Sequence, residues 1–308
     1  MEMAKMIFHG VMPPTITPFK ANGQVDYSAF IANIKAWNQT GLSGYLVNGS
    51  NSETAYLSEE EKLRLVALAA EHAAPGRMLT AGTGMEEPQA TIALTNKCAE
   101  AGAASALVLT PSYYGAAMTS GALIDFFTRV AEGSKIPILI YNVPKFTHVN
   151  IKADAVAALS CHENIIGMKD SAGDVPQLAA FQRASLGQRF SLLVGTVSAW
   201  YPALALGIEA GIHAAANCAP NACVAVQKAY EAGDFQRAQG IYSALLPLNT
   251  AVTATYGIAG LKHACGLAGY QGGQVRCPLQ PLDGAARSQV EKIFAAAREE
   301  LAQYECQP

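Results

Sequence analysis

The middle of the chain reads Ile136-Pro-Ile-Leu-Ile-Tyr141 and then, after a segment of helical pattern at Lys152–Ser160, Ile165-Ile-Gly-Met-Lys169. Both quoted runs are continuously apolar up to their last residue instead of alternating with polar residues, which is typical of strands covered on both faces in a parallel sheet. Parallel neighbours need a crossover connection, and a helix is the usual one. The stretch therefore predicts one strand–helix–strand unit of an α/β fold.

The same unit recurs through most of the chain. Eight short apolar runs are separated by segments of helical pattern: Val11–Thr15, Gly44–Asn48, Met78–Ala81, Ala106–Thr110, Ile136–Tyr141, Ile165–Lys169, Ser191–Gly195 and Gly211–Ala215. Ser58-Glu-Glu-Glu61 has the form of a capping box and predicts the start of a helix that continues through Lys62–Ala73. Eight such units favour a closed (β/α)8 TIM barrel, with an open doubly wound sheet as the alternative.

Strand signals end near Val224, and only helical pattern follows. Four further helices are expected, at Cys223–Ala232, Asp234–Leu245, Gly257–Cys265 and Gly284–Gln303. Breaks are expected at Pro247 and in the loop Gly269–Pro281. Because no linker-like or low-complexity stretch intervenes, the sequence predicts a barrel at residues 1–224 and a C-terminal helical extension at residues 225–308 that packs on it.

Composition and charge disfavour several classes of partner. Of the 308 residues, 51% are hydrophobic and 15% are charged, which is ample for a large core. The net charge is −3 with no basic run or acidic tail, so neither nucleic acid nor an anionic membrane surface is an expected partner. The apolar runs are too short for a membrane-spanning helix, and Met1–Gly10 lacks the apolar core of a secretory signal.

The cysteines point to a reducing compartment. Seven are scattered along the chain without a CxxC pair, at Cys98, Cys161, Cys218, Cys223, Cys265, Cys277 and Cys306. Neither a disulfide framework nor a zinc site has this spacing. We therefore expect reduced thiols in a cytoplasmic protein.

Polar residues stand where the predicted strands end, and that end of a (β/α)8 barrel carries the active site. They are Asn48–Glu53 after the second strand, Tyr113 and Tyr114 after the fourth, Tyr141-Asn142 at the fifth, Lys169–Ser171 at the sixth, Gly195-Thr196 at the seventh and Asn217 after the eighth. We expect these side chains to line one site at the barrel mouth.

Lys169 is the most informative of them. It ends an apolar run, whereas the other eleven lysines are expected in the N-terminal tail, in loops or at polar positions of helices. Burial disfavours the ammonium form of a lysine, and the neutral amine can attack a carbonyl to form a Schiff base. The alternative is a lysine whose stem is buried while its head reaches solvent or pairs with Asp170.

Tyr141 ends the neighbouring strand and is a candidate acid–base group beside such an amine. Schiff-base formation and carbon–carbon cleavage both move protons near the 2-oxo carbon, and Ser50 and Tyr113 could relay them. A tyrosine at a strand end is otherwise a core residue. The turn Gly49-Ser-Asn-Ser52 could bring backbone N–H groups to a carboxylate, although serine and asparagine are also ordinary turn residues.

Metal and nucleotide sites have little support. His148 and His213 lie nearest to strand ends, but no HxxxH or histidine–carboxylate pair has ligand spacing, which disfavours a metal-dependent aldolase. Gly82-Thr-Gly84 lacks the third glycine of a dinucleotide fingerprint, and no Walker lysine follows it. No metal or nucleotide cofactor is expected.

Together these motifs resemble the dihydrodipicolinate synthase / N-acetylneuraminate lyase family of pyruvate-handling class I aldolases. The matching stretches follow in family order over nearly the whole chain: Pro14–Pro18, Gly49–Glu53, Leu79–Gly84, Thr110–Tyr114, Tyr141–Pro144 and Asn164–Asp170. The separation of 28 residues between Tyr141 and Lys169 also fits. The resemblance implies a (β/α)8 barrel. It also implies an enzyme that needs no cofactor, because a lysine of its own chain forms the covalent Schiff base.

The resemblance also implies a role for each matching residue. Lys169 forms the Schiff base with the 2-oxo group, and Tyr141 is the general acid–base. Protons pass through Ser50 to a second tyrosine, which is Tyr113, with Tyr114 as the alternative. In this family the second tyrosine often comes from a neighbouring subunit, which implies a homo-oligomer, either a tetramer or a dimer.

The implied substrate is a small 2-oxo acid bound by Asn51, Ser171 and Gly195. Synthases of the family usually carry an arginine where this chain has Phe146, which makes condensation with aspartate semialdehyde doubtful. The combination of Gly49-Ser-Asn51 with Gly-Met-Lys-Asp-Ser171 is similar to the group that cleaves 4-hydroxy-2-oxoglutarate to pyruvate and glyoxylate. Tyr256–Lys262 and Arg276–Leu279 are further similarities to that group.

Three alternatives stay open. Two are within the family: a dihydrodipicolinate synthase, and a 2-keto-3-deoxy sugar acid aldolase or dehydratase. The third is of a different class, a pyruvate-binding protein without catalytic activity. The presence of both Lys169 and Tyr141 disfavours this third possibility, because a protein that only binds has no need of the pair.

Overall fold

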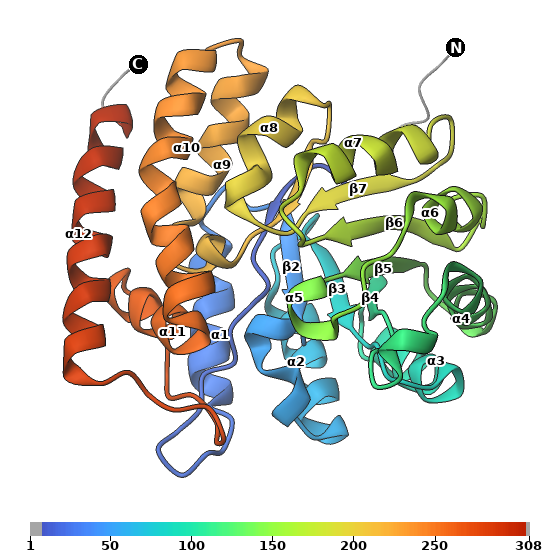
Figure 1. The fold of residues 1–308 in the computed structure, drawn as a ribbon. Coiled ribbons are helices and arrows are strands. Elements are labelled where there is room, and N and C mark those ends of the chain that lie inside the picture. Colours follow the sequence, from blue (N-terminus) through green and yellow to red (C-terminus); the bar gives the residue numbers. More distant parts are fainter. Residues whose placement is uncertain (1–7, 306–308) are drawn as a thin grey trace.

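The computed structural model describes residues 8–305 as a barrel of parallel strands surrounded by helices (Figure 1). Most of the segment Met1–Gly10 lies outside the described residues, and so does Cys306 at the other end of the chain. Within them eight strands occur: β1 (Gly10–Met12), β2 (Gly44–Val47), β3 (Met78–Gly82), β4 (Ser105–Leu109), β5 (Ile138–Asn142), β6 (Ile165–Asp170), β7 (Ser191–Val194) and β8 (Ala210–Ile212). Each overlaps one of the predicted runs.

The strands form one parallel sheet in the order β1-β8-β7-β6-β5-β4-β3-β2. Its two ends are joined, because Ser43 N donates to Val11 O over 2.9 Å and Leu46 N donates to Pro13 O over 3.0 Å. The predicted (β/α)8 barrel is therefore confirmed, and the open sheet is wrong. The last strand is shorter than expected, since it ends at Ile212 and a 3-10 turn follows at Ala214–Asn217.

Helices follow the strands around the outside of the barrel. Their bounds are α1 (Tyr27–Trp37), α2 (Glu59–His72), α3 (Pro88–Glu100), α4 (Ser120–Gly133), α5 (Pro144–Thr147), α6 (Ala153–Leu159), α7 (Val175–Ala184), α8 (Trp200–Ala205) and α9 (Pro220–Glu231). The capping box that begins α2 is present, because Ser58 Oγ accepts from Glu61 N while the Glu61 carboxylate accepts from Ser58 N.

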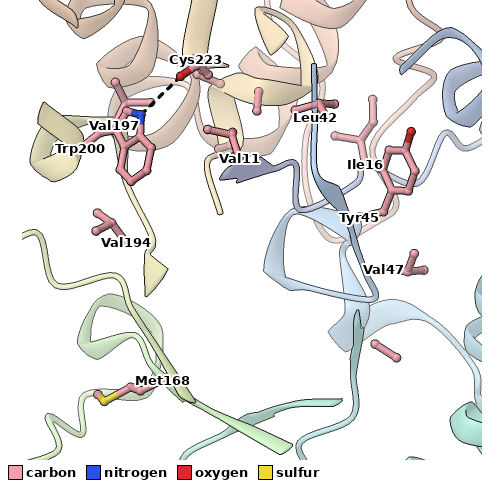
Figure 2. Close-up of a cluster of buried hydrophobic side chains, with 14 of the residues drawn as sticks. Val11, Ile16, Leu42, Tyr45, Val47, Met168, Val194, Val197, Trp200 and Cys223 are labelled. Atoms are coloured by element: carbon pink, nitrogen blue, oxygen red, sulfur yellow. Dashed lines mark hydrogen bonds between the residues drawn. The ribbon is translucent and has the colours of Figure 1, made fainter. Parts of the chain in front are cut away.

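The core has two layers because successive residues of a strand point to opposite faces of the sheet. In β5, Leu139 and Tyr141 belong to the cluster inside the barrel, whereas Ile138 and Ile140 belong to the larger cluster between the sheet and the helices. Figure 2 shows part of the larger cluster, in which the buried Trp200 indole donates to the carbonyl of Cys223. The barrel interior is thus filled, and ligands can reach it only at its ends.

The C-terminal helices α10 (Phe235–Thr250), α11 (Gly257–Leu267) and α12 (Gly284–Glu305) lie together on one side of the barrel (Figure 1). The predicted break at Pro247 is wrong, because α10 continues through it and a π-helical turn, Ala251–Thr255, follows directly. Leu248 beside the proline is buried, so tertiary packing holds a helix that an isolated chain would bend or break here. Residue 224 lies within α9, and the division into barrel and extension stays a prediction.

Two further expectations concern the protein's surroundings. In the part of the chain from residue 8 to residue 305, no helix is long and apolar enough to cross a membrane. The cysteines in this part are free thiols, at Cys98, Cys161, Cys218, Cys223, Cys265 and Cys277.

Candidate active site

Lys169 and Tyr141 lie side by side at the carboxyl ends of β6 and β5. They are direct partners in the register of the two strands, and Lys169 Nζ lies 4.4 Å from the centre of the Tyr141 ring. Both are buried, with 3% and 6% of their surfaces exposed. The arrangement places an amine and a phenol together in a mostly apolar barrel end, as the sequence predicted.

Asp170 points away from Lys169. Its carboxylate accepts hydrogen bonds from Asn142 Nδ2 over 2.7 Å and from Gln177 Nε2 over 3.2 Å, and burial raises its pKa above the usual range of a carboxyl. Adjacent strand residues face opposite sides of a sheet, so the two side chains diverge. Between residues 8 and 305 no ion pair joins them, and the alternative of a Lys169–Asp170 pair is wrong.

Ser50 is within reach of the tyrosine. It begins the 3-10 turn Ser50–Ser52 that follows β2, and its Oγ lies 3.4 Å from Tyr141 Oη. Asn51 is half-buried in the same turn. The first N–H groups of a helical turn have no acceptor within the turn. The turn therefore brings one hydroxyl to Tyr141 and leaves backbone donors at the barrel mouth.

The two candidate relay tyrosines are exposed in the single chain. Tyr113 is 80% exposed and Tyr114 is 72% exposed, and their rings meet edge to face at 5.0 Å. Their loop is held by the Glu86 carboxylate, which accepts from Ser112 N and Tyr113 N. No hydrogen bond links either phenol to Ser50 in the described part of the chain, so one chain does not complete the expected relay by itself.

Ser171 and Gly195 meet at the ends of β6 and β7. Gly195 N donates to Asp170 O over 2.6 Å, and a Cβ added at Gly195 would lie 1.9 Å from Ser171 Oγ. The absence of a side chain at Gly195 therefore makes the room in which the serine hydroxyl sits. Ser171 Oγ is buried and has no hydrogen-bond partner among residues 8–305. An unpaired buried hydroxyl is costly, and a ligand oxygen would satisfy it.

A buried ion pair behind the Ser50 turn was missed by sequence reasoning. Lys262 was expected at a polar helix position, but only 2% of its side chain is exposed, and its Nζ lies 2.5 Å from the Glu53 carboxylate. The expectation for this lysine is wrong because α11 packs against α12, against the π-helical turn Ala251–Thr255 and against the 3-10 turn that follows β8. Apart from Lys262 and His263, the segment Gly257–Leu267 is apolar or glycine, and a lysine in such a segment could have drawn attention to it.

His213 follows β8 and is fully buried, with its ring 4.9 Å from that of Trp200. Neither ring nitrogen has a hydrogen-bond partner in the described chain. Burial, and to a smaller extent the charge of Lys169, lowers the pKa of His213 to about 3. His213 is therefore a neutral core residue in this structure. The same described residues contain no group of three metal-ligating side chains.

Acid is expected to destabilise the fold through His213. An unfolded histidine takes up a proton near pH 6.5, whereas His213 in the folded chain stays neutral down to about pH 3. The unfolded state then binds more protons in this window, so the free energy of unfolding falls as the pH drops below about 6.5. We expect His213→Leu to flatten this dependence, measured by urea unfolding at several pH values.

The control for this prediction is Leu204→Ala in α8, because it truncates a buried side chain without removing a titratable group. That variant should keep the wild-type dependence of unfolding free energy on pH. Equal slopes for wild type and His213→Leu between about pH 6.5 and pH 4 would show that burial of His213 does not contribute to acid sensitivity.

The profile of the dihydrodipicolinate synthetase family matches residues 7–297. The chain belongs to this family. Among its relatives, the 4-hydroxy-tetrahydrodipicolinate synthase of Methanothrix thermoacetophila is 34% identical over 94% of this chain and 96% of its own length. The enzyme of the same name from Agrobacterium fabrum is 37% identical over 89% and 92%.

Solved structures of the dihydrodipicolinate synthetase family have the same fold. The 4-hydroxy-tetrahydrodipicolinate synthase of Methylacidiphilum fumariolicum SolV superposes with a TM-score of 0.90 at 28% identity, over 96% of this chain and 98% of that one. A prophage protein of the family from E. coli K12, solved with pyruvate, gives 0.89 at 28% identity, over 95% and 99%. As a family member the chain is a Schiff-base-forming lyase that uses a lysine of its own and no separate cofactor.

Proposed function

We propose that this class I aldolase cleaves 4-hydroxy-2-oxoglutarate to pyruvate and glyoxylate, with Lys169 as the covalent nucleophile. The observation that carries the proposal is the buried Lys169 amine beside Tyr141, whose hydroxyl lies 3.4 Å from Ser50 Oγ. A nucleophile, an acid–base group and a proton relay are what Schiff-base cleavage needs at one carbon.

The first half of the reaction builds the Schiff base. The Lys169 amine adds to the C2 carbonyl, and Tyr141 gives a proton to the oxygen that becomes the hydroxyl of the carbinolamine. Tyr141 then takes a proton from the nitrogen of the adduct and passes it to this hydroxyl, which leaves as water as the iminium forms. The low exposure of Lys169 keeps bulk water away from the iminium until cleavage is complete.

The second half breaks the carbon–carbon bond. Tyr141, with Ser50 beside it, accepts the proton of the C4 hydroxyl. The C3–C4 bond then breaks, glyoxylate leaves as the aldehyde, and the bonding electrons pass into the enamine of pyruvate with the iminium nitrogen as the acceptor. Protonation at C3 and addition of water release pyruvate and restore the Lys169 amine.

Substrate binding is assigned to the turn after β2 and to the ends of β6 and β7. The backbone N–H groups of Ser50 and Asn51 would receive the C1 carboxylate. Ser171 Oγ, which is buried beside Gly195 and has no partner within residues 8–305, would bond an oxygen of the C4–C5 part of the substrate. This hydroxyl supports a substrate whose distal half carries a hydroxyl and a carboxylate.

The exposed tyrosines support a homo-oligomer. Tyr113 is proposed as the relay tyrosine of a neighbouring subunit, with Tyr114 as the alternative, because both project from a loop fixed by Glu86 and neither is covered in the single chain. A tetramer or a dimer would satisfy this arrangement. The free, dispersed cysteines support the proposed cytoplasmic location.

Condensation of pyruvate with aspartate semialdehyde is the second candidate, favoured by the names of the relatives. Against it, the exposed Phe146 stands at the position of the usual arginine, and the Lys145 ammonium beside it donates to Thr253 O over 2.8 Å. The cation of this segment is thus a lysine already bonded to Thr253 O, in place of an arginine that can bind a carboxylate through two parallel donors. A 2-keto-3-deoxy sugar acid is the third candidate substrate.

A substrate panel tests the proposal. Release of pyruvate from 4-hydroxy-2-oxoglutarate and from a 2-keto-3-deoxy sugar acid is measured beside condensation of pyruvate with aspartate semialdehyde. We expect kcat/KM for 4-hydroxy-2-oxoglutarate to exceed the others by about tenfold or more, a difference of about 1.4 kcal/mol in the transition state. Condensation with the semialdehyde and no cleavage of 4-hydroxy-2-oxoglutarate would refute the proposed substrate. No turnover of any substrate and no covalent adduct with pyruvate would favour the alternative of a binding protein without catalytic activity.

A further inference from the structure

The Ser50 turn is held from behind by the Glu53 side chain. Glu53 directly follows the turn, has a left-handed backbone with φ of 57°, and has a fully buried carboxylate. One carboxylate oxygen pairs with Lys262 Nζ, and the other accepts from Arg276 N over 2.8 Å. A left-handed glutamate persists only where its surroundings hold it, so these two contacts bear directly on the conformation of the turn.

Lys262 comes from α11, in the C-terminal extension. Its Nζ also donates to Gln274 O over 2.6 Å and lies 4.5 Å from the centre of the Phe19 ring. Burial lowers the pKa of Lys262 to about 8, and the nearby Glu53 carboxylate acts against that lowering. Removing one partner of a buried pair leaves an uncompensated charge, whereas removing both charges does not.

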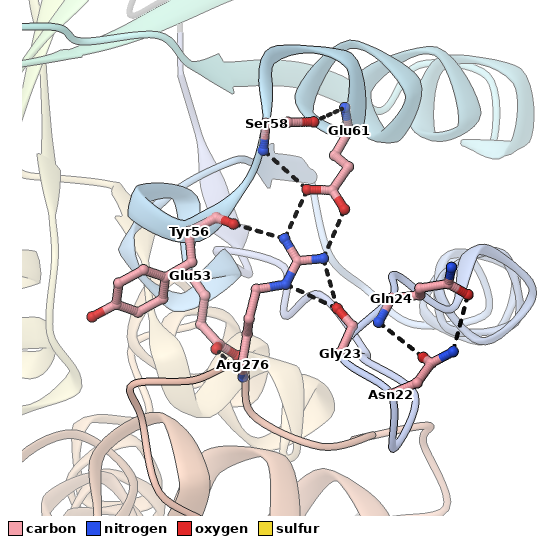
Figure 3. Close-up of polar contacts among 8 residues, drawn as sticks. All are labelled: Asn22, Gly23, Gln24, Glu53, Tyr56, Ser58, Glu61 and Arg276. Atoms are coloured by element: carbon pink, nitrogen blue, oxygen red, sulfur yellow. Dashed lines mark hydrogen bonds and ion pairs between the residues drawn. The ribbon is translucent and has the colours of Figure 1, made fainter.

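Arg276 lies in the loop between α11 and α12 and binds this loop to the start of α2 (Figure 3). Its guanidinium makes two 2.7 Å hydrogen bonds to the Glu61 carboxylate and one to the carbonyl of Tyr56. It also donates to Gly23 O over 2.7 Å. The loop between α11 and α12 is therefore bound to the chain on both sides of the turn, before it and after it.

The loop can approach this closely because of its glycines. A Cβ added at Gly272 would lie 2.0 Å from Lys262 O, and one at Gly273, whose φ is 67°, would lie 2.7 Å from Phe19 N. Gly272 and Gly273 thus let the backbone pass against α11 on one side and against the chain after β1 on the other. The close packing brings Gln274 O to the Lys262 ammonium and Arg276 N to the Glu53 carboxylate.

We propose that Lys262 is a positioning residue of the active site: its ion pair with Glu53 holds the Ser50–Ser52 turn so that Ser50 Oγ stays within reach of Tyr141. The C-terminal extension thereby acts on the chemistry through a buried contact at Glu53. The inference rests on the proposed Schiff-base function and deepens it, because it assigns a second lysine whose ammonium shapes the site instead of reacting. A shift of the turn by about 1 Å is enough to cost about a hundredfold in rate.

A double-mutant cycle on the full-length protein tests the inference. The variants are Glu53→Gln, Lys262→Met and the pair together, and each is assayed for kcat, KM and the rate of borohydride trapping of pyruvate on Lys169. We expect kcat to fall about tenfold in Glu53→Gln and about a hundredfold in Lys262→Met. The double variant should be no slower than Lys262→Met, because the pair is already lost in that single variant and the two losses therefore do not multiply.

Two comparisons separate positioning from simple loss of stability. Leu245→Ala in α10 truncates a fully buried side chain of the same extension, so it should lower the melting temperature and leave kcat per folded protein unchanged. Glu53→Gln keeps the shape and an acceptor for Arg276 N, so it reports on the charge even if Lys262→Met does not fold. Wild-type kcat in folded Glu53→Gln, or losses that multiply independently in the double variant, would overturn the inference.

Trapping also distinguishes this inference from the proposed function. It needs only pyruvate, so coupling between Glu53 and Lys262 is measurable whichever aldehyde is the true partner. Wild-type protein that traps no pyruvate would overturn the proposed function and the inference with it. Wild-type protein that traps pyruvate, beside folded variants that trap it at the same rate and turn over equally fast, would overturn the inference alone.

Discussion

Lys169→Met is expected to lose the covalent adduct with pyruvate and to lower kcat by about a thousandfold or more, because no other group can take the place of the amine in the covalent step. Methionine keeps most of the apolar stem, which packs at the barrel mouth beside Tyr141. The fold should therefore persist, and the melting temperature should change little. The loss then reports on chemistry and not on packing.

Borohydride reduction in the presence of pyruvate, followed by intact mass and peptide mapping, measures the adduct. The wild-type protein should gain one reduced pyruvyl group on the peptide that contains Lys169. Lys35→Ala, an exposed lysine of α1, is the matched control and should trap and turn over like wild type. An adduct on another lysine, or undiminished turnover in Lys169→Met, would contradict the assignment of the nucleophile.

Tyr141→Phe is expected to lower kcat by about 10²–10⁴-fold, the usual contribution of a positioned acid–base group. Phenylalanine keeps the ring that lies 4.4 Å from Lys169 Nζ, and only the hydroxyl facing Ser50 is removed. The amine remains, so the pyruvate adduct should still form, but more slowly. The variant thus separates the capacity to form a Schiff base from the ability to move protons.

Single-turnover trapping beside steady-state kinetics measures both effects of Tyr141→Phe. Tyr242→Phe is the control, because that phenol donates to Ser198 O on the outside of the barrel. A Tyr141→Phe variant whose kcat stays within about twofold of wild type would mean that another group carries the protons. Complete loss of the adduct would mean instead that the hydroxyl is needed to place the amine.

The barrel was predictable because its signals are local. Each strand is a short continuous apolar run followed by a helical pattern. Eight such strand–helix units are typical of one common architecture, the closed (β/α)8 barrel. Lys169 and Tyr141 were predictable for the same reason, since both end a strand, and ends of neighbouring parallel strands meet at one edge. The helix through Pro247 was not predictable, because a proline normally bends or ends a helix and here the burial of α10 outweighs that tendency.

The sequence by itself determined the strand–helix repeat, the pairing of an amine with a phenol at the barrel mouth, and the turn that carries Ser50. Only the tertiary structure decided that Lys262 is buried against Glu53, that Gly195 makes room for Ser171, and that Tyr113 and Tyr114 are exposed. The physical reason is the separation along the chain of the residues that interact. Strand and helix patterns repeat within one segment, whereas Lys262 and Glu53 lie on distant segments, and their pairing follows from how the C-terminal helices pack on the barrel.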